Sequence, residues 1–173
     1  KVIPVILNNT EDVVAIAKTG TGKTVAFGLP LLQLIDNSKN NIQAVILAPT
    51  RELGQQIFKS LEAFNSSQLN VSIAGVFGGI PIKPQIETLK STTHIVVATP
   101  GRLADLIERN AIHIKEISYF VLDEADEMVS AHKEGVDAII KVLPKSRRTL
   151  LFTATMPGTI KQLVQNSLSK KVL

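Results

Sequence analysis

The segment AKTGTGKT at residues 17–24 constrains the fold of this chain more than any other feature of its sequence. It follows a short apolar run and precedes a stretch with the apolar spacing of a helix, so it joins an expected strand to an expected helix. Gly20 and Gly22 can adopt positive φ values, which lets backbone N–H groups turn inward around a phosphate at the start of that helix. Lys23 would then place its charge beside the β- and γ-phosphates, and Thr24 would direct its hydroxyl toward Mg²⁺. The segment therefore predicts a binding site for a nucleoside triphosphate.

One position departs from the usual form of this loop, because Ala17 stands where a glycine is usual. An ordinary glycine–threonine turn between a strand and a helix would explain the glycines, but it would not require the Gly-Lys-Thr ending. We therefore favour phosphate binding. The residues expected to bind the nucleotide are Thr19, Gly20, Thr21, Gly22, Lys23 and Thr24.

The composition is that of one globular domain. The chain has 173 residues, and 45% of them are hydrophobic, which is enough for a sizeable core. It has no cysteine, which excludes disulfides, a thiolate nucleophile and Cys-bound zinc. No apolar run approaches the roughly 20 residues of a membrane span, and no leader is evident, so we expect a soluble, cytoplasmic protein with no membrane partner. The net charge of +4 is compatible with a polyanionic partner, although so small an excess is common in soluble proteins.

Short apolar runs alternate along the chain with amphipathic stretches of helical length. This alternation is typical of repeated βα units, which build a parallel sheet covered on both faces. Strands are expected at 13–17, 44–48, 71–77, 94–98, 119–122 and 149–152. Helices are expected at 24–35, 51–64, 84–90, 102–109, 133–143 and 157–168. The sequence thus predicts an α/β fold with a mostly parallel β-sheet flanked by helices on both faces, in a single domain over residues 1–173.

An acidic tetrapeptide, DEAD at residues 123–126, follows one of the expected strands. The carboxyl ends of parallel strands share one edge of a sheet, so this segment should lie near the phosphate loop. Asp123 would hold Mg²⁺, largely through water, opposite Thr24. Glu124 is the candidate general base that would orient the attacking water, and Lys23 would neutralise phosphate charge. Acidic residues also favour a helix N-terminus, but their combination with a phosphate loop favours catalysis.

With these two segments together, the chain resembles the first RecA-like P-loop domain of the DEAD-box ATP-dependent RNA helicases. Further motifs of that domain follow in family order, as PTREL at 49–53, GG at 78–79, TPGR at 99–102 and TAT at 153–155. The resemblance covers almost the whole chain. It implies a RecA-like fold, ATP and Mg²⁺ as ligands, and ATP hydrolysis coupled to the remodelling or unwinding of RNA duplexes.

Two of these motifs place a hydroxyl, free backbone amides and an arginine at an expected helix start, which suits a phosphate group. From spacing alone, helix capping by Thr50 and Thr99 is the slightly better explanation. The resemblance implies instead that these motifs hold the RNA backbone with little sequence preference. The RNA-binding residues it implies are Pro49, Thr50, Arg51, Gly78, Gly79, Thr99, Pro100, Gly101 and Arg102. The phenylalanines lie in apolar patterns and are expected in the core, so base stacking is not predicted.

In the family, the TAT segment links the nucleotide state to strand separation, and the resemblance assigns this coupling to Asp126, Thr153 and Thr155. Thr153 stands where the family usually has serine. The hydroxyl is kept but the side chain is stiffer, which can alter the coupling while hydrolysis is retained. The family's Gly-Phe after the acidic motif is also absent from residues 126–133, so either local helix packing or a contact with a partner should differ there.

A basic cluster lies before the last expected strand, at the opposite edge of the sheet from the motifs. It consists of Lys141, Lys145, Arg147 and Arg148. We expect it to be a solvated face.

The resemblance also implies parts that the chain does not contain. Ile3 and Pro4 match the end of the family's adenine-reading Q motif, whose glutamine would precede Lys1. The second RecA-like domain, with the arginine finger, would follow the chain. We therefore expect a fragment that is monomeric, binds nucleotide weakly and turns over negligibly by itself.

Two other functions remain open at this stage. One is a helicase or translocase that acts on DNA, because distinguishing RNA requires contacts to the 2′-hydroxyl. The other is a non-catalytic RNA clamp that binds ATP without hydrolysis, against which the complete set of Lys23, Asp123 and Glu124 argues.

Overall fold

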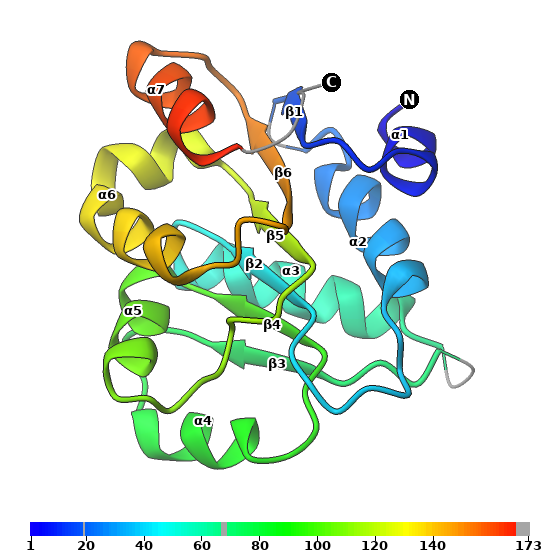
Figure 1. The fold of residues 1–173 in the computed structure, drawn as a ribbon, viewed down its shortest axis with the longest axis vertical. Helices are drawn as coiled ribbons and strands as arrows, with labels where there is room; N and C mark the ends of the chain where they lie inside the picture. The colour runs from blue at the N-terminus through cyan, green and yellow to red at the C-terminus, as the bar shows by residue number, and fades with distance from the viewer. Residues whose placement is uncertain (19, 67–68, 169–173) are drawn as a thin grey trace.

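The computed structural model describes residues 1–18, 20–66 and 69–168. Its strands form one parallel sheet in the order β1-β6-β5-β2-β4-β3, with helices on both sides (Figure 1). The strands are β1 (Val13–Ile16), β2 (Ala44–Leu47), β3 (Ile73–Val76), β4 (Ile95–Ala98), β5 (Tyr119–Leu122) and β6 (Arg148–Thr153). The helices are α1 (Val2–Asn8), α2 (Lys23–Leu34), α3 (Arg51–Phe64), α4 (Ile82–Leu89), α5 (Pro100–Glu108), α6 (Ala125–Val142) and α7 (Gly158–Ser167). The predicted α/β fold, with a parallel sheet flanked by helices on both faces, is confirmed.

The sheet divides the hydrophobic core into two layers. Successive residues of a strand point to opposite faces, so Val45 and Leu47 of β2 lie in one layer and Ala44 and Ile46 in the other. Helices α1, α2 and α3 cover the layer that contains Ile46, while α4, α5, α6 and α7 cover the layer that contains Leu47. All residues of β2 and β4 are buried, as expected for central strands covered on both faces.

Four phenylalanines are fully or nearly fully buried, which confirms their expected place in the core, and two are half-buried at its margin. The buried ones are Phe27, Phe77, Phe120 and Phe152, and the half-buried ones are Phe58 and Phe64. The rings of Phe27 and Phe152 lie 5.3 Å apart between α2 and β6.

Each expected strand and helix overlaps an observed one, but several boundaries differ. The expected strand 71–77 is shortened to β3. Helix α6 begins at Ala125, eight residues before the expected start, because the acidic residues Asp126 and Glu127 occupy its first turn, where they suit the helix dipole. Helix α5 begins at Pro100, a favourable first position for proline. Helix α1 was not predicted, since its seven residues give too little periodicity to recognise.

The expectation that the basic cluster is solvated is wrong for two of its four residues. Lys141 and Lys145 are exposed, but Arg147 and Arg148 are only 4% and 5% exposed. Arg147 donates a hydrogen bond to the Pro144 carbonyl, and its guanidinium lies 5.8 Å from the centre of the Phe120 ring. Backbone carbonyls and an aromatic face thus replace water around these groups.

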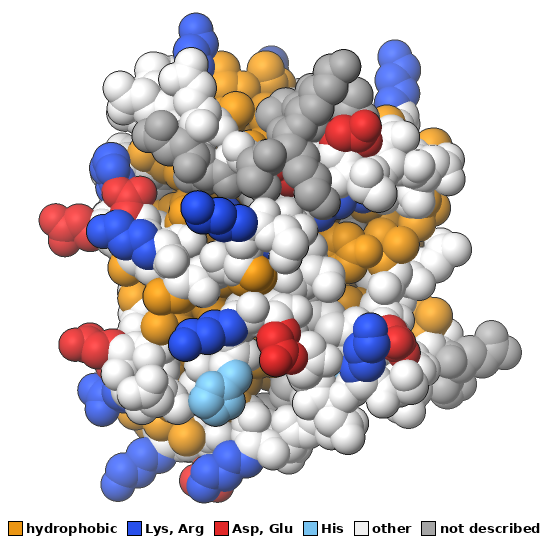
Figure 2. Space-filling model, viewed as in Figure 1, with side chains coloured by type: hydrophobic (Ala, Val, Ile, Leu, Met, Phe, Trp, Pro, Cys, Tyr) orange, Lys and Arg blue, Asp and Glu red, His pale blue; other side chains and the backbone are white. Residues whose placement is uncertain are grey.

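Charged side chains of both signs are interspersed on the face shown in Figure 2. Blue and red side chains lie near one another there, so the net charge of +4 is not gathered into one basic patch on this face. None of the described helices is both long and apolar enough to cross a membrane.

Gly54 of α3 provides a test of how tightly the helices pack on the sheet. A Cβ atom at this position would lie 2.5 Å from Cε1 of the buried Phe77 ring. Alanine is the better helix former by about 1 kcal/mol, but forcing the ring aside costs about 1–3 kcal/mol. We expect Gly54→Ala to lower the free energy of unfolding in urea by about 1 kcal/mol.

The matched control is Gly158→Ala in the first turn of α7, where a Cβ would meet nothing within 4 Å. This variant should be unchanged or slightly more stable. An equal rise in the free energy of unfolding for both variants would contradict the close contact between α3 and Phe77.

Candidate functional site

Six of the motifs singled out in the sequence lie at the carboxyl edge of the sheet. All strand pairs are parallel, so the segments that follow them emerge at the same edge. These segments are the phosphate loop after β1, the PTREL motif after β2, the GG motif after β3, the TPGR motif after β4, the acidic tetrapeptide after β5 and the TAT motif at the end of β6. The expected convergence is observed.

The phosphate loop has the backbone geometry that its glycines predict. Gly20 and Gly22 have φ values of 81° and 84°, and Gly22 directly precedes the first residue of α2. The Thr21 hydroxyl donates a hydrogen bond to the Lys18 carbonyl at 2.7 Å, which closes the loop. Among the described residues, no side chain caps the first turn of α2, so its N–H groups are available to an anion. Thr19 lies outside the described residues.

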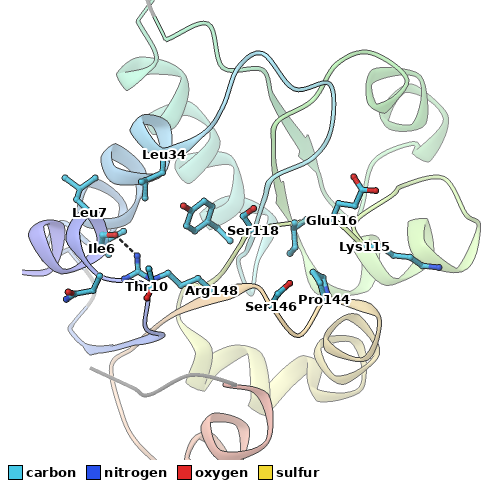
Figure 3. A pocket seen from close by; sticks show the side chains of 13 residues that line it. Ile6, Leu7, Thr10, Leu34, Lys115, Glu116, Ser118, Pro144, Ser146 and Arg148 are labelled. Carbon is cyan, nitrogen blue, oxygen red and sulfur yellow. Dashed lines mark hydrogen bonds between the residues drawn. The ribbon is translucent and has the colours of Figure 1, made fainter.

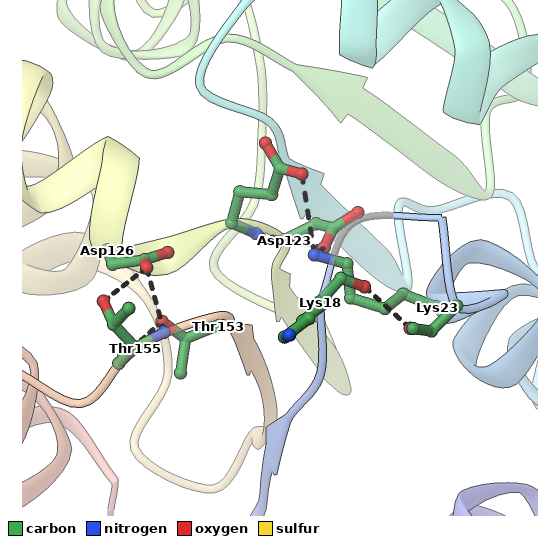
Figure 4. A network of polar contacts seen from close by, with 8 residues as sticks. Lys18, Lys23, Asp123, Asp126, Thr153 and Thr155 are labelled. Atoms are coloured by element: carbon green, nitrogen blue, oxygen red, sulfur yellow. Dashed lines mark hydrogen bonds and ion pairs between the residues drawn. The ribbon is translucent and has the colours of Figure 1, made fainter.

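Lys23 lies between the two catalytic candidates of the acidic tetrapeptide (Figure 4). Its Nζ atom is 3.3 Å from Oδ1 of Asp123 and 3.6 Å from Oε1 of Glu124. Lys23 is 7% exposed and Asp123 only 1%. Burial raises the pKa of Asp123, and the charge of Lys23 opposes this shift. The ammonium group thus offsets the burial of the carboxylates beside the phosphate loop.

The donors at this position suit a magnesium ion as well as a phosphate. Asp123 supplies a carboxylate at the end of β5, and Thr24 supplies a hydroxyl in the first turn of α2. Oxygen donors from one carboxylate and one hydroxyl, with water and phosphate oxygens, make the usual environment of Mg²⁺. The residues present therefore fit the ion.

Glu124 occupies a strained turn between β5 and α6. Its φ and ψ values are 53° and 51°, a left-handed conformation that is uncommon for a residue with a side chain. Its backbone N–H donates a hydrogen bond to Oδ1 of Asp123 at 3.0 Å. The turn directs Glu124 toward an open hollow of about 620 Å³, which it lines together with Asp126, Thr155 and Pro157. A carboxylate is thus held where the site opens to solvent.

The three residues expected to couple nucleotide state to strand separation are in contact. Asp126 Oδ2 accepts hydrogen bonds from the Thr155 backbone N–H at 3.0 Å and from its hydroxyl at 2.6 Å. The Thr153 hydroxyl donates to the Thr155 carbonyl at 2.7 Å. Although burial favours a higher pKa for Asp126, the hydrogen bonds from Thr155 and then Thr153 outweigh it and lower the pKa. The first turn of α6 is therefore bound to the segment after β6 (Figure 4).

The GG loop is held by the starts of α3 and α5. Arg51 Nη1 donates to the Gly79 carbonyl at 3.5 Å, and Arg102 Nη2 donates to the Ile80 carbonyl at 3.0 Å. The Gly78 N–H donates to the Thr99 hydroxyl at 3.1 Å. Arg102 Nη1 is buried and has no hydrogen-bond partner among the described residues. Three motifs that are far apart in sequence thus form one surface.

The capping explanation is correct for one threonine and wrong for the other. The Thr50 hydroxyl accepts a hydrogen bond from the Leu53 N–H and caps α3, whereas Thr99 uses its hydroxyl for Gly78 and does not cap α5. Pro49 and Pro100 are buried, while Gly101 is exposed with open space at its Cβ position. Among the residues implied to bind RNA, the two prolines therefore contribute through local packing.

Sequence reasoning missed an apolar groove beside the phosphate loop. The groove measures about 620 Å³ and is bounded by α1, β1 and the start of α2. Ile16 and Val25 line it and are 65% and 39% exposed, which is unusual for such large apolar side chains. The apolar residues near the start of the chain were the available signal, but their helix was not recognised.

The segment without the family's Gly-Phe is also irregular. Within α6, His132 has φ and ψ values of −138° and 28°, so the helix is kinked there. The expectation of altered local geometry at residues 126–133 is consistent with this kink.

The sequence matches the model of one family over most of its length. Residues 1–163 match the DEAD/DEAH box helicase family. The DEAD-box ATP-dependent RNA helicase CshA of Streptococcus pneumoniae is 49% identical over 162 residues, which are 93% of this chain and 30% of that protein.

Solved structures also resemble the chain over nearly its whole length. A DEAD box protein from the hyperthermophile Methanococcus jannaschii superposes with a TM-score of 0.93 at 42% identity, over 99% of this chain and 47% of that one. A hypothetical ATP-dependent RNA helicase from Sulfolobus tokodaii gives a TM-score of 0.88 at 33% identity, over 99% of this chain and 50% of that one. The chain thus spans between 30% and 50% of the length of these three proteins.

The motifs, the fold and the similarity over nearly the whole sequence agree, and the chain belongs to the DEAD/DEAH box helicase family.

Proposed function

We propose that this chain is the ATP-binding domain of an ATP-dependent RNA helicase. Residues 1–173 would form a single RecA-like domain that binds ATP with Mg²⁺ and the RNA backbone. The observation that carries the proposal is the buried contact of Lys23 with Asp123 and Glu124 beside the open N-terminus of α2. A lysine, a metal-binding carboxylate and a candidate base are the groups that phosphoryl transfer to water requires.

Each group has a distinct role in this proposal. The backbone N–H groups of the phosphate loop hold the β-phosphate, and Thr19 and Thr21 belong to the same loop. Lys23, which contacts two carboxylates, turns its charge to the β- and γ-phosphates when ATP binds. Thr24 and Asp123 would hold Mg²⁺, largely through water, and the ion would neutralise charge on the phosphate oxygens. Glu124 orients the attacking water and accepts its proton.

Turnover would require a second RecA-like domain, since the chain spans only 30% to 50% of the length of its relatives. An arginine supplied from another domain is worth roughly 10³ to 10⁵ in rate in related phosphoryl transfers. We therefore propose that the chain alone, as a monomer, binds ATP weakly and hydrolyses it negligibly. Closure of the two domains would complete the site.

The surface around the GG loop is the proposed site for RNA. Arg51 and Arg102 both reach the loop at residues 78–80, and Gly101 leaves open space at the start of α5. Two guanidinium groups and exposed backbone suit a phosphate–sugar chain and offer few groups that would read bases. RNA would then bind with little sequence preference.

Coupling between the two sites is proposed to run through Asp126. Its carboxylate joins the helix that follows Glu124 to Thr155, at the end of the TAT motif, through two hydrogen bonds. Movement of the acidic tetrapeptide upon hydrolysis would therefore pull on the segment after β6. Thr153 helps to hold Thr155 in place, because its hydroxyl donates a hydrogen bond to the Thr155 carbonyl.

Replacing the proposed base tests the chemistry. In the full-length protein, we expect Glu124→Gln to lower RNA-stimulated kcat about 10²- to 10⁴-fold, because glutamine cannot accept the proton. Affinity for ATP should remain close to that of the unchanged protein. The control is Glu134→Gln, which removes the same charge from an exposed position on α6. If the unchanged protein binds ATP and RNA but never turns over, the chain is a clamp and not a helicase.

Replacing an arginine at the GG loop tests the RNA surface. We expect Arg51→Gln to weaken binding of single strands of different sequence by a similar factor, and to reduce the slope of log affinity against log salt by about 0.7. Arg109→Gln, at an exposed position after α5, is the control that removes one charge elsewhere. A sequence-dependent loss would contradict backbone binding, and equal affinity for matched DNA strands would favour a DNA-directed enzyme.

The Asp126 contact predicts a pH-dependent contribution to stability. Because the folded-state pKa of Asp126 is lowered, its contribution is present above the ordinary aspartate pKa and is lost as the pH falls through the folded value. We expect Asp126→Asn to reduce the free energy of unfolding by about 1 kcal/mol at pH 7, and by less near pH 3.

Urea titrations at several pH values would measure this difference. The control is Asp137→Asn on the same helix, which removes an exposed ion pair to Lys133 and should cost less. If the loss of unfolding free energy caused by Asp126→Asn grew toward acid pH, the lowered pKa of Asp126 in the folded state would be contradicted.

A further inference from the structure

We propose that Arg148 is a positioning residue for the nucleotide base, because it fixes helix α1 as one wall of the apolar groove beside the phosphate loop. This inference rests on the proposed function, since it assigns that groove to the base end of ATP. It concerns a residue at the opposite edge of the sheet from the phosphate loop and the acidic tetrapeptide.

The Arg148 side chain ties the end of α1 to the sheet (Figure 3). Its Nη1 donates a hydrogen bond to the Ile6 carbonyl, its Nη2 to the Val5 carbonyl at 3.2 Å, and its Nε to the Glu11 carbonyl at 2.6 Å. Arg148 is the first residue of β6 and is 5% exposed. One guanidinium group therefore fixes both the last turn of α1 and the segment that follows it.

Helix α1 needs such a contact. It has seven residues, whereas helices shorter than about 12–15 residues are marginal in water without tertiary support. The Val5 carbonyl accepts a hydrogen bond from the Asn9 N–H at the end of the helix, and the positive charge of Arg148 near the last carbonyls also suits the helix dipole. Ile6 is its one fully buried residue among those described, and Val2 and Val5 are only partly buried against the same core layer, so apolar packing secures the helix on one side only.

The same helix forms a wall of the groove. Lys1, Val2, Ile3 and Val5 line the groove opposite Val25 and the residues of β1. Val5 therefore lines the groove and accepts a hydrogen bond from Arg148 through its carbonyl. A shift of the last turn of α1 would move this wall directly.

The position of the groove suggests which part of the nucleotide it would contact. Gly22 and Lys23 of the phosphate loop line one end of it, so a nucleotide whose phosphates lie on the loop would place its base along the apolar surface. Ile16 and Val25 expose apolar area there, which a flat aromatic ring would cover. Inorganic tripolyphosphate would use the loop without touching α1.

The geometry also explains why the residue is an arginine. Three donors of one planar group reach three carbonyls in different directions. Lysine carries its charge at one point, and glutamine has two donors on one nitrogen and no charge. A lysine at this position should therefore hold α1 in place partly, and a glutamine very little.

The test compares two ligands in the full-length protein. We expect Arg148→Gln to weaken ATP binding about tenfold while leaving the affinity for tripolyphosphate unchanged, so the ratio of the two affinities falls. The affinity ratio of Arg148→Lys should lie between those of the unchanged protein and of Arg148→Gln. The lysine variant provides the test if the glutamine variant does not fold. Hydrogen exchange of the amides of residues 6–8 should be faster in Arg148→Gln. Arg109→Gln is the control for lost charge and should change neither ratio nor exchange.

The outcomes separate the two proposals. An unchanged affinity ratio in both Arg148 variants, or an equal loss for ATP and tripolyphosphate, would overturn the role of Arg148 while leaving ATP binding intact. If the unchanged protein bound ATP no more tightly than tripolyphosphate, the assignment of the groove to the base would be overturned as well. If it bound neither ligand, the proposed function itself would fail.

Discussion

The buried contact between Lys23 and the acidic pair Asp123 and Glu124 joins the two elements on which the site is built. Lys23 begins α2 and Asp123 follows β5, so the contact fixes the phosphate loop against the centre of the sheet. Charges at this depth are tolerated only when they are paired, and removing one would leave the others uncompensated. The same arrangement leaves a lysine and two carboxylates together beside open N–H groups, ready for a ligand that carries both negative phosphates and a cation.

The two edges of the sheet have different polar networks. At the carboxyl edge, side chains such as Arg51, Arg102 and Asp126 bind loops that carry the motifs, and they remain partly accessible. At the amino edge, buried polar groups serve the fold. His94 accepts a hydrogen bond from the Ser72 N–H at Nδ1 and lies 2.9 Å from the Lys39 carbonyl through Nε2, while Arg148 holds α1. Through α1, the second network reaches the groove beside the first.

Local patterns predicted most of the fold because each depends on nearby residues. Apolar runs gave the strands, and the glycines of the phosphate loop gave its positive φ values. The errors arose where a distant partner decides the outcome. Nothing near Arg147 and Arg148 in sequence indicates that Phe120 and the end of α1 will surround them, so burial could not be foreseen. The same holds for Thr99, whose hydroxyl is used by Gly78 and not by its own helix.

The sequence by itself determined the class of fold, the phosphate loop and the residues of the candidate site, because strand and helix periodicity and glycine-rich turns are local properties of the chain. Only the tertiary structure decided which of these residues touch. It placed Lys23 against Asp123 and Glu124, Asp126 against Thr155, and α1 against Arg148. These contacts depend on the order of the strands in the sheet, and that order follows from how the two core layers fill, which no single segment encodes.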